Sequence, residues 1–468
     1  MSLHAVTAGA ARRLPQGGLR PEDPRSPLRR LALLCDPGSL RLLDPPAEPI
    51  AVAAAVGRVN GRPVVCYGHD AGLSAGAVGT AEAELVVRAL RLARDRSVPV
   101  VAFLESAGAR LQEGAAALGG FGRIFYENVA LTGRVPQISV IAGLSAGGGC
   151  YSPALTDFTV MTRDAAMFLT GPGVVKEVLA EEISAGELGG PDVHRGNGVC
   201  HFVAEDAAAA AGVVRDLLGY LPPRAGVPAL REPEPPGDAD PGQHVPRSPR
   251  RVYDVRSVIR SIADAGAFLE VAERWAPNMV TGFARIEGRT VGVIANQPKR
   301  LGGVIDVHAS EKGARFVTGC DRFGIPLLVL VDTPGFMPGR HQECAGIIRH
   351  GAGLVRAFAA ASVPRVTVVL RKAYGGGYIT MNSKDLGASH TIAWTGAEIG
   401  VMGAVAAVKL LHRRELAAAG HSPALLERLA DEYAARHISA GRALRDGTID
   451  AVIPPTETRA RVAEALSL

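Results

Sequence analysis

The fold is decided by two similar stretches of sequence, Val98-Pro-Val-Val-Ala-Phe-Leu-Glu-Ser-Ala-Gly108 and Ile325-Pro-Leu-Leu-Val-Leu-Val-Asp-Thr-Pro-Gly335. Each reads as a buried strand that ends at a glycine, and the two glycines are 227 positions apart. The same spacing separates Gly57-Arg-Val-Asn-Gly-Arg-Pro-Val64 from Ala284-Arg-Ile-Glu-Gly-Arg-Thr-Val291. A register that holds in both halves predicts two domains of one fold.

Each half also carries a glycine cluster after a further strand. Val135-Pro-Gln-Ile-Ser-Val-Ile141 leads to Ala146-Gly-Gly-Gly149, and Val363-Pro-Arg-Val-Thr-Val-Val369 leads to Tyr374-Gly-Gly-Gly377. We expect helices to begin near Tyr151 and Ile379, so that each cluster forms a strand-to-helix turn with unpaired N–H groups. Such a turn suits an oxyanion hole, because glycine lets a ligand oxygen approach the main chain. The alternative is that the glycines serve only tight turns or close packing.

The pattern between these motifs predicts an α/β fold. Apolar runs that are continuous rather than alternating read as buried strands, and they alternate with helical stretches. The expected strands include Val100 to Leu104, Ile138 to Ile141, Leu327 to Val331 and Val366 to Leu370, and the expected helices include Glu82 to Ala93 and Lys312 to Cys320. No dinucleotide-binding or P-loop glycine motif opens any of these helices, which disfavours the nucleotide-binding α/β folds.

Prolines indicate where the domains end. Residues 222–249 are too rich in proline for helix interiors or central strands, which predicts a linker. We therefore expect a disordered tail over residues 1–30, a first domain over 31–221, the linker over 222–249 and a second domain over 250–468.

The composition is that of an ordinary soluble globular protein. The 468 residues carry a net charge of +5 with no block of like charge, so nucleic-acid binding is not favoured. No apolar run reaches the roughly 18 residues that span a bilayer, so no membrane is expected. The six cysteines lie far apart and lack a metal-binding spacing, which predicts free thiols, no metal and a cytoplasmic protein, a mitochondrial location being less favoured.

Side chains suited to acid–base or nucleophilic catalysis are scarce. Ser106 and Ser145 lack the local frame of a catalytic nucleophile, and the Glu181-Glu182 pair reads as a solvated helix face. The remaining candidates are four histidines in unrelated contexts, His69, His194, His341 and His350. We infer a reaction in which the substrates supply their own base, while the protein supplies position and electrostatics.

A longer set of motifs resembles the carboxyltransferase (β) subunits of biotin-dependent acyl-CoA carboxylases, the acetyl-CoA and propionyl-CoA carboxylase group. The resemblance covers about residues 33 to 455, and its motifs occur in the family's order. They are Tyr151-Ser-Pro-Ala-Leu-Thr-Asp-Phe158, Leu169-Thr-Gly-Pro172, Glu187-Leu-Gly-Gly190, Val280-Thr-Gly-Phe-Ala-Arg285, Ala295-Asn-Gln-Pro298, Ala309-Ser-Glu-Lys312, Val331-Asp-Thr-Pro-Gly-Phe336, Gly346-Ile-Ile-Arg-His-Gly351 and Arg371-Lys-Ala-Tyr-Gly-Gly376.

The resemblance implies two tandem crotonase-like domains, each a spiral of ββα units, in a homo-hexamer built as a trimer of dimers. It places acyl-CoA on the first domain and carboxybiotin on the second. By motif, the amides of Gly147 and Gly148 would hold the thioester enolate oxygen, and those of Gly376 and Gly377 the ureido oxygen of biotin. Further substrate contacts are expected from Ser145, Ala146, Gly108, Ala109, Tyr378 and Ile379, and cofactor contacts from Gly375, Tyr374, Gly335 and Phe336.

The implied activity is carboxyl transfer from carboxybiotin to the α-carbon of acetyl-CoA, propionyl-CoA or a longer acyl-CoA, giving a malonyl-type CoA for fatty acid or polyketide biosynthesis. Since the sequence has no Met-Lys-Met biotinylation site, a separate biotin carboxyl carrier and biotin carboxylase are expected as partners. Two alternatives stay open: a biotin-dependent decarboxylase or transcarboxylase, and a catalytically silent subunit of a carboxylase complex.

The resemblance also implies that the residue at position 379 tracks the choice of acyl chain. Ile379 favours acetyl-CoA or a wider range of acyl chains, although it could nearly equally be a core residue. Other positions depart from the family's pattern. Gly377 replaces the usual alanine, Trp394-Thr-Gly stands where Trp-Pro is usual, and Ala404-Val-Ala-Ala replaces a commoner glycine-containing stretch. The lead-in before Leu34-Cys-Asp-Pro-Gly-Ser39 is short, which predicts altered binding of the CoA nucleotide. We interpret these features as those of a divergent relative dedicated to an unusual extender unit.

Overall fold

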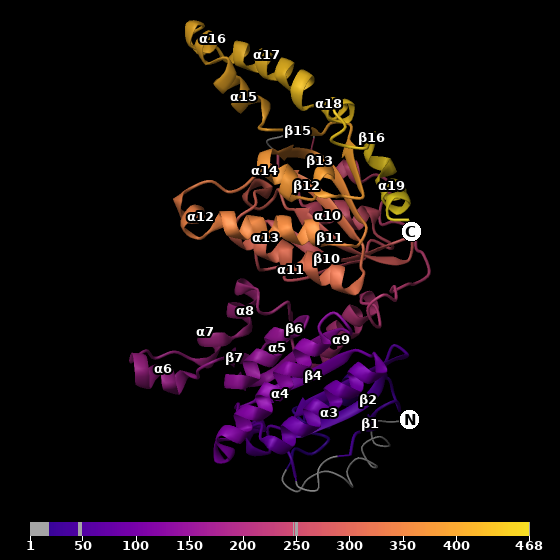
Figure 1. Cartoon of the computed structure of the whole chain (residues 1–468), viewed down its shortest axis with the longest axis vertical. Helices are drawn as coiled ribbons and strands as arrows, with labels where there is room; N and C mark the ends of the chain where they lie inside the picture. The colour runs from indigo at the N-terminus through magenta and orange to yellow at the C-terminus, as the bar shows by residue number, and fades with distance from the viewer. Residues whose placement is uncertain (1–17, 45–48, 247, 249–250, 468) are drawn as a thin grey trace. The chain divides into compact units, whose positions relative to one another are not determined.

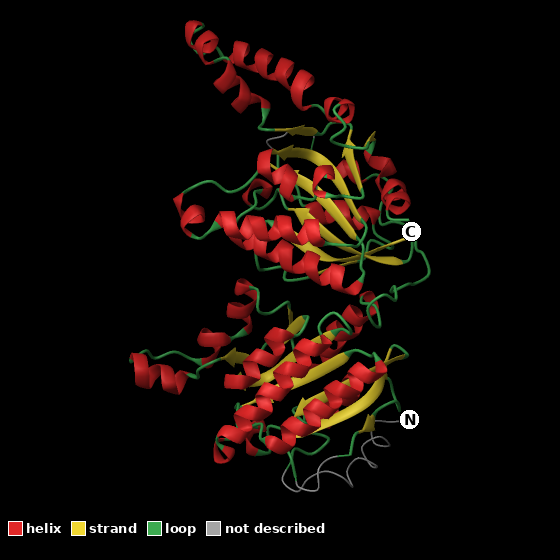
Figure 2. Ribbon diagram, viewed as in Figure 1, coloured by secondary structure: helices red, strands yellow, loops and turns green. Residues whose placement is uncertain are grey.

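The computed structural model describes residues 18–44, 49–246, 248 and 251–467. The chain divides into two compact units, an N-terminal unit, Met1–Ala229, and a C-terminal unit, Leu230–Leu468 (Figure 1). Each unit is built on an eight-stranded sheet covered by helices, so the predicted α/β class is confirmed (Figure 2).

The sheet of the N-terminal unit runs in the order β1-β2-β3-β4-β5-β6-β8, and β7 pairs with β5. The strands β2 and β3 form an antiparallel hairpin, and β3 to β8 pair in parallel. Every residue of β4 is buried, as expected for a parallel strand covered on both faces. The strands are β1 Arg41–Leu42, β2 Val52–Val59, β3 Arg62–His69, β4 Val100–Ser106, β5 Gln137–Ala146, β6 Phe158–Thr162, β7 Ala166–Phe168 and β8 Phe202–Ala204.

The sheet of the C-terminal unit has the same plan, in the order β16-β14-β13-β12-β11-β10-β9 with β15 paired to β13. The antiparallel hairpin is β10 with β11, and β11 to β16 pair in parallel. The strands are β9 Phe268–Glu270, β10 Met279–Ile286, β11 Arg289–Asn296, β12 Leu327–Thr333, β13 Arg365–Tyr374, β14 His390–Trp394, β15 Glu398–Gly400 and β16 Ala451–Ile453.

Long helices lie along each sheet and close an apolar core beneath it (Figure 2). In the N-terminal unit the helices are α2 Pro27–Leu34, α3 Thr80–Arg96, α4 Ala115–Leu131, α5 Tyr151–Leu155, α6 Pro172–Leu179, α7 Ala185–Gly189, α8 Pro191–Asn197 and α9 Ala207–Tyr220. In the C-terminal unit they are α10 Val255–Ile262, α11 Val307–Phe323, α12 Arg340–Cys344, α13 Ile347–Ala360, α14 Gly375–Thr380, α15 Ala404–Leu411, α16 Arg413–Ala418, α17 Pro423–Tyr433, α18 Ala440–Arg445 and α19 Thr458–Ala465.

The strands and helices expected from the apolar pattern all lie inside observed elements, but one helix begins earlier than predicted. The helix expected near Ile379 starts at Gly375, because the glycines themselves form its first turn. In the N-terminal unit a short 3-10 turn, Gly147–Cys150, precedes the helix that starts at Tyr151.

The ends of the predicted domains differ from the observed units. The border between Ala229 and Leu230 falls inside the predicted linker 222–249, and from Leu230 onward the segment packs on the C-terminal unit. Leu230 bridges to Arg289 and Pro236 to Asp264, so this part is not a free linker. Of the predicted tail 1–30, residues 1–17 lie outside the described residues. The predicted boundary of the tail at residue 30 is wrong, because helix α2 begins at Pro27.

In the parts of the chain that the structure describes, no helix is long and apolar enough to cross a membrane.

Candidate functional site

Each unit places a glycine turn at the carboxyl end of a central strand. In the N-terminal unit β5 ends at Ala146, and Gly147 then adopts a φ of +57°, a value that residues other than glycine rarely adopt. In the C-terminal unit β13 ends at Tyr374, and Gly375 adopts a φ of +54°. The N–H groups that follow lie in the first turn of a helix, where no intrahelical carbonyl is available to them. Both turns therefore offer main-chain donors to a ligand oxygen.

The two turns match residue for residue, and this match refines the predicted donor pairs. Gly147 corresponds to Gly375, since each is the first residue after its strand and each has a positive φ. Gly148 then corresponds to Gly376. The predicted pair Gly147 and Gly148 therefore has Gly375 and Gly376 as its counterpart, one position before the predicted pair Gly376 and Gly377.

A loop from the neighbouring strand faces each turn. The hydroxyl of Ser106 accepts a hydrogen bond from the N–H of Gly108 at 3.1 Å, and that of Thr333 accepts one from Gly335 at 3.2 Å. Gly108 has a φ of +102° and lies so close to the turn that an added Cβ would be 3.1 Å from the carbonyl oxygen of Ala146. The loop and the turn thus form one compact main-chain frame in each unit.

A buried acidic residue precedes each loop. It is Glu105 in the N-terminal unit, where the pairing of β4 with β5 shifts register, and Asp332 in the C-terminal unit, where the pairing of β12 with β13 shifts register. Glu105 binds the buried guanidinium of Arg30 at 2.7 Å and the exposed one of Arg25. Asp332 binds Arg371 at 3.1 Å. Burial raises the pKa of Asp332, while the adjacent cations oppose this shift. Both acids are enclosed and ion-paired, so we assign them to holding the loops rather than to proton transfer.

Aromatic rings cover the glycine turns. An added Cβ on Gly148 would lie 2.9 Å from the ring of Phe121, a residue of α4. Phe125 continues this row, with its ring centre 6.0 Å from that of Tyr151, whose side chain is 51% exposed. In the C-terminal unit the ring of Phe336 lies 3.5 Å from the corresponding point on Gly376.

The other predicted contact residues divide into exposed and enclosed groups. Ile379 is 53% exposed, so its alternative interpretation as a core residue is wrong. Tyr374 donates its hydroxyl to Glu398, and Tyr378 donates to the carbonyl of Thr448 at 2.8 Å. Burial raises the pKa of Tyr378 to about 12, so its phenol stays neutral. Ser145 is fully buried, and its hydroxyl has no hydrogen-bond partner among the described residues.

The candidate acid–base groups are not arranged for catalysis. His69 is buried, and burial together with Arg30 lowers the pKa of its imidazole to about 4. His194 bonds the carbonyl of Met167 at 2.6 Å. Among the described residues, no cluster of His, Cys, Asp or Glu could hold a metal ion. The groups that both turns offer to a ligand are main-chain N–H groups.

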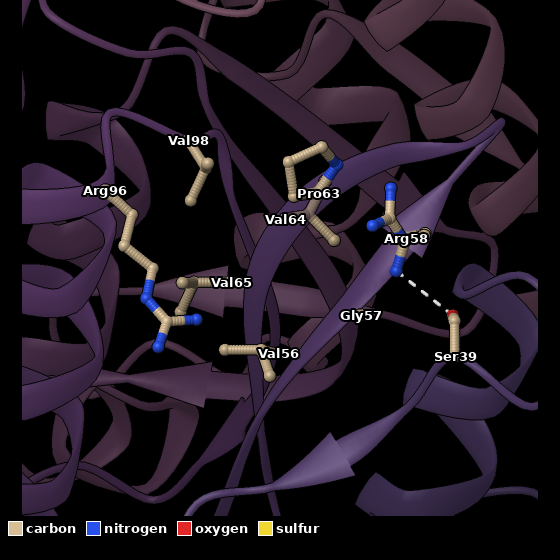
Figure 3. A pocket seen from close by; sticks show the side chains of 9 residues that line it. All are labelled: Ser39, Val56, Gly57, Arg58, Pro63, Val64, Val65, Arg96 and Val98. Carbon is tan, nitrogen blue, oxygen red and sulfur yellow. Dashed lines mark hydrogen bonds between the residues drawn. The ribbon is translucent and has the colours of Figure 1, made fainter.

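A cavity of about 200 Å³ lies elsewhere in the N-terminal unit. Its walls include Arg58, Arg96, Val64 and Val98, and Figure 3 shows the two arginine side chains on either side of the valines. Val65, also in its wall, pairs with Val100 at the start of β4, whereas the glycine turn follows the end of β5. The cavity is thus separate from the candidate site.

The sequence matches a known family and several known relatives. The family model described as "Carboxyl transferase domain" matches residues 43–468. The chain belongs to the carboxyl transferase domain family. It is 45% identical over 417 residues to the methylmalonyl-CoA carboxyltransferase 12S subunit of Propionibacterium freudenreichii subsp. shermanii, covering 88% of this chain and 79% of that one.

Two further comparisons cover nearly the whole chain. The biotin-dependent acetyl-/propionyl-coenzyme A carboxylase beta6 subunit of Mycobacterium bovis is 45% identical, over 95% of this chain and 94% of that one. The transcarboxylase 12S crystal structure, a hexamer assembly with methylmalonyl-coenzyme A bound, superposes with a TM-score of 0.89 at 42% identity, over 95% of this chain and 89% of that one. The predicted family and the predicted crotonase-like fold are confirmed.

Sequence reasoning missed Phe121 and the pair of Arg30 with Glu105. The repeat held a signal for the acid, because Glu105 precedes Asp332 by the same 227 positions as the loop glycines. No such signal exists for Arg30, which comes from a segment that the composition assigned to a tail.

Proposed function

We propose that the two glycine turns are the two oxyanion holes of a biotin-dependent acyl-CoA carboxyltransferase. The chain is a carboxyltransferase of the acetyl-/propionyl-CoA carboxylase type. In our assignment the turn at Gly147 and Gly148 binds the thioester oxygen of the acyl-CoA, and the turn at Gly375 to Gly377 binds the ureido oxygen of biotin. The observation that carries the proposal is the repeated frame, in which loop and turn meet in the same way twice.

The donor set suits both ligands. Removing a proton from the α-carbon of an acyl-CoA places negative charge on the thioester oxygen, and fixed N–H donors stabilise that charge without titrating. The ureido oxygen of biotin, on which negative charge would develop as the carboxyl group leaves, needs the same kind of donor. At Gly377 the fit of the main chain is tight, because an added Cβ would lie 2.8 Å from the Cα of Gly335. Carboxybiotin, when bound, would supply the carboxyl group to be transferred.

The role of the side chains is to shape and support these holes. The loops are held from behind by the buried ion pairs of Glu105 and Asp332. The aromatic row that begins at Phe121 gives the first hole an apolar border. Such a border excludes water and strengthens hydrogen bonds to the developing oxyanion.

We further propose that the chain acts as a homo-hexamer, a trimer of dimers, with a separate biotin carboxyl carrier and biotin carboxylase. The support is that a relative is named as a subunit of a biotin-dependent carboxylase and that transcarboxylase 12S is a hexamer. The cytoplasmic location and the choice of acyl chain stay predictions from the sequence.

Transcarboxylation is a second candidate reaction, because one relative at 45% identity is a methylmalonyl-CoA carboxyltransferase 12S subunit. The two reactions share the site and differ in where the carboxyl group comes from. A purified chain that moves the carboxyl group of methylmalonyl-CoA to a second acyl-CoA, given a biotinylated carrier, would favour transcarboxylation.

The test of the proposed function is biotin-dependent loss of CO2 from malonyl-, methylmalonyl- and ethylmalonyl-CoA by the purified chain. We expect turnover that needs both free biotin and an unsubstituted Gly148. Absence of turnover with all three compounds, from a folded oligomer, would contradict the proposal and favour the silent subunit.

A further inference from the structure

The two loops that face the glycine turns have the same main-chain structure. In the N-terminal unit the N–H of Val78 binds the carbonyl of Gly108 at 2.8 Å, and a parallel bridge joins Val78 to Ala109. In the C-terminal unit the N–H of Ile305 binds the carbonyl of Gly335 at 3.0 Å, and a parallel bridge joins Ile305 to Phe336. The loops therefore differ at this point in their side chains, a methyl group in one unit and a benzyl group in the other.

The ring that covers the turn comes from a different element in each unit. In the N-terminal unit it is Phe121, which reaches Gly148 from helix α4. In the C-terminal unit it is Phe336, which reaches Gly376 from the loop after β12. The region beside the turn is thus filled by a ring from the helix in the N-terminal unit and by a ring from the loop in the C-terminal unit.

This difference is a reciprocal exchange between equivalent positions. Phe336 follows Ala109 by 227 positions, and Ile348 follows Phe121 by the same number. The helices share this register, because Leu131 and Phe358, also 227 apart, are both fully buried. Where Phe121 is 5% exposed, Ile348 points into solvent with 78% exposure.

A second exchange on the helix makes room for the loop ring. The ring of Phe336 lies 3.1 Å from the place where a Cβ on Gly351 would stand. The equivalent residue of the N-terminal unit is Ile124, which is 4% exposed. Because glycine stands at 351, the ring from the loop fits between α13 and the turn.

We infer that this exchange makes the two holes select different ligands, with Ala109 and Phe336 as the specificity-determining residues. The inference rests on the proposed function. A flexible acyl chain needs space beside its carbonyl carbon. In the N-terminal unit Phe121 fills the space on the helix side of the turn. The space must therefore lie on the loop side, where Ala109 has only a methyl group. In the C-terminal unit the ring of Phe336 fills the space on the loop side of the turn. The ligand that fits beside this turn is therefore a flat one that lies against the ring.

The experiment enlarges residue 109 stepwise, with Ala109→Val and Ala109→Phe, in the full-length oligomer. Binding of propionyl-CoA is measured by calorimetry, and the KM for free biotin is measured in the decarboxylation of methylmalonyl-CoA. We expect the Kd for propionyl-CoA to rise with side-chain volume, by about tenfold or more for Ala109→Phe. The KM for biotin should stay as in the unchanged chain. Phe336→Ala should give the opposite result, a raised KM for biotin with unchanged binding of propionyl-CoA.

A matched control adds a ring at an exposed position near the far end of α4. Val129 is 56% exposed and follows Phe121 by eight residues, so Val129→Phe should change neither constant. Circular dichroism and the elution volume of the oligomer establish that each variant folds. A folded Ala109→Phe variant that binds propionyl-CoA normally, or that raises both constants equally, would overturn the inference alone. If the unchanged chain itself bound no acyl-CoA, the proposed function would fall, and this inference with it.

Discussion

Replacing Gly148 by alanine should impair the first of the two proposed oxyanion holes through one defined clash. The new Cβ would lie 2.9, 3.0 and 3.1 Å from three ring atoms of Phe121. Distances this short require the ring or the turn to move. The ring is 5% exposed and packs against Phe125, whose centre is 5.8 Å away, so it cannot swing freely into solvent. Part of the displacement therefore falls on the turn.

The size of the effect follows from two terms. An extra methyl group in a well-packed site costs about 1–3 kcal/mol in the free energy of unfolding. Moving one N–H donor away from an oxyanion lowers kcat by about 10² to 10³. The matched variant is Gly376→Ala, whose Cβ would meet the ring of Phe336 at an ordinary 3.5 Å. We expect that variant to lose much less activity than Gly148→Ala.

The assay is biotin-dependent release of CO2 from methylmalonyl-CoA, with kcat and KM determined separately. A double variant supplies the decisive comparison, because Phe121→Ala removes Cγ, Cδ1 and Cδ2, the three ring atoms that the new methyl group meets. Combined with Gly148→Ala, it should restore most of the lost kcat. The reasoning is refuted if Gly376→Ala is as damaging as Gly148→Ala, or if the double variant is no more active than Gly148→Ala alone.

Three further predictions concern groups away from the turns. Arg30→Met leaves buried Glu105 with only the exposed Arg25, so the free energy of unfolding from urea titration should fall by about 3 kcal/mol, against no comparable fall for Arg29→Met. Burial lowers the pKa of Lys312 from 10.5 to about 7. Between pH 7 and pH 10.5 the unfolded state therefore binds more protons than the folded state, so the free energy of unfolding of the unchanged chain should increase as the pH rises through this window. Lys312→Met should lose that slope in unfolding midpoints measured across the window. Cys344 is the exposed cysteine, so a thiol reagent should titrate one thiol per folded chain and none in Cys344→Ser.

Each of these has a clear contrary result. A normal unfolding midpoint for Arg30→Met would mean that the ion pair contributes nothing net to stability. Equal pH slopes with and without Lys312 would mean that its amine is charged in the fold. Rapid reaction of more than one thiol would mean that the five buried cysteines become exposed in the native state.

The sequence predicted the frame of the site well because the frame depends on backbone chemistry. The glycines at 108, 147, 335 and 375 all have positive φ, and such a requirement leaves a direct mark on the sequence. Continuous apolar runs likewise predicted β4 and β12, whose residues are all buried. The spacing of 227 positions between equivalent motifs was enough to relate the two halves to each other.

The walls of the site could not be predicted in this way. Whether a phenylalanine covers a turn depends on which helix or loop faces it, and Phe121 and Phe336 reach equivalent glycines from different elements. Arg30 carries no local signal either, since its partner Glu105 lies 75 residues away in sequence. Contacts of this kind depend on tertiary packing, which periodicity and composition do not encode.

The division of the chain at Ala229 and Leu230 has a consequence for the gene. Each unit has an apolar cluster of its own, one formed by residues between Ile50 and Cys200 and the other by residues between Tyr253 and Leu466. A domain with its own core can fold as a separate polypeptide. A reading frame interrupted between Ala229 and Leu230 would therefore yield two foldable products. What the continuous chain adds is stoichiometry, because it guarantees one acyl-binding half for every biotin-binding half in the assigned scheme.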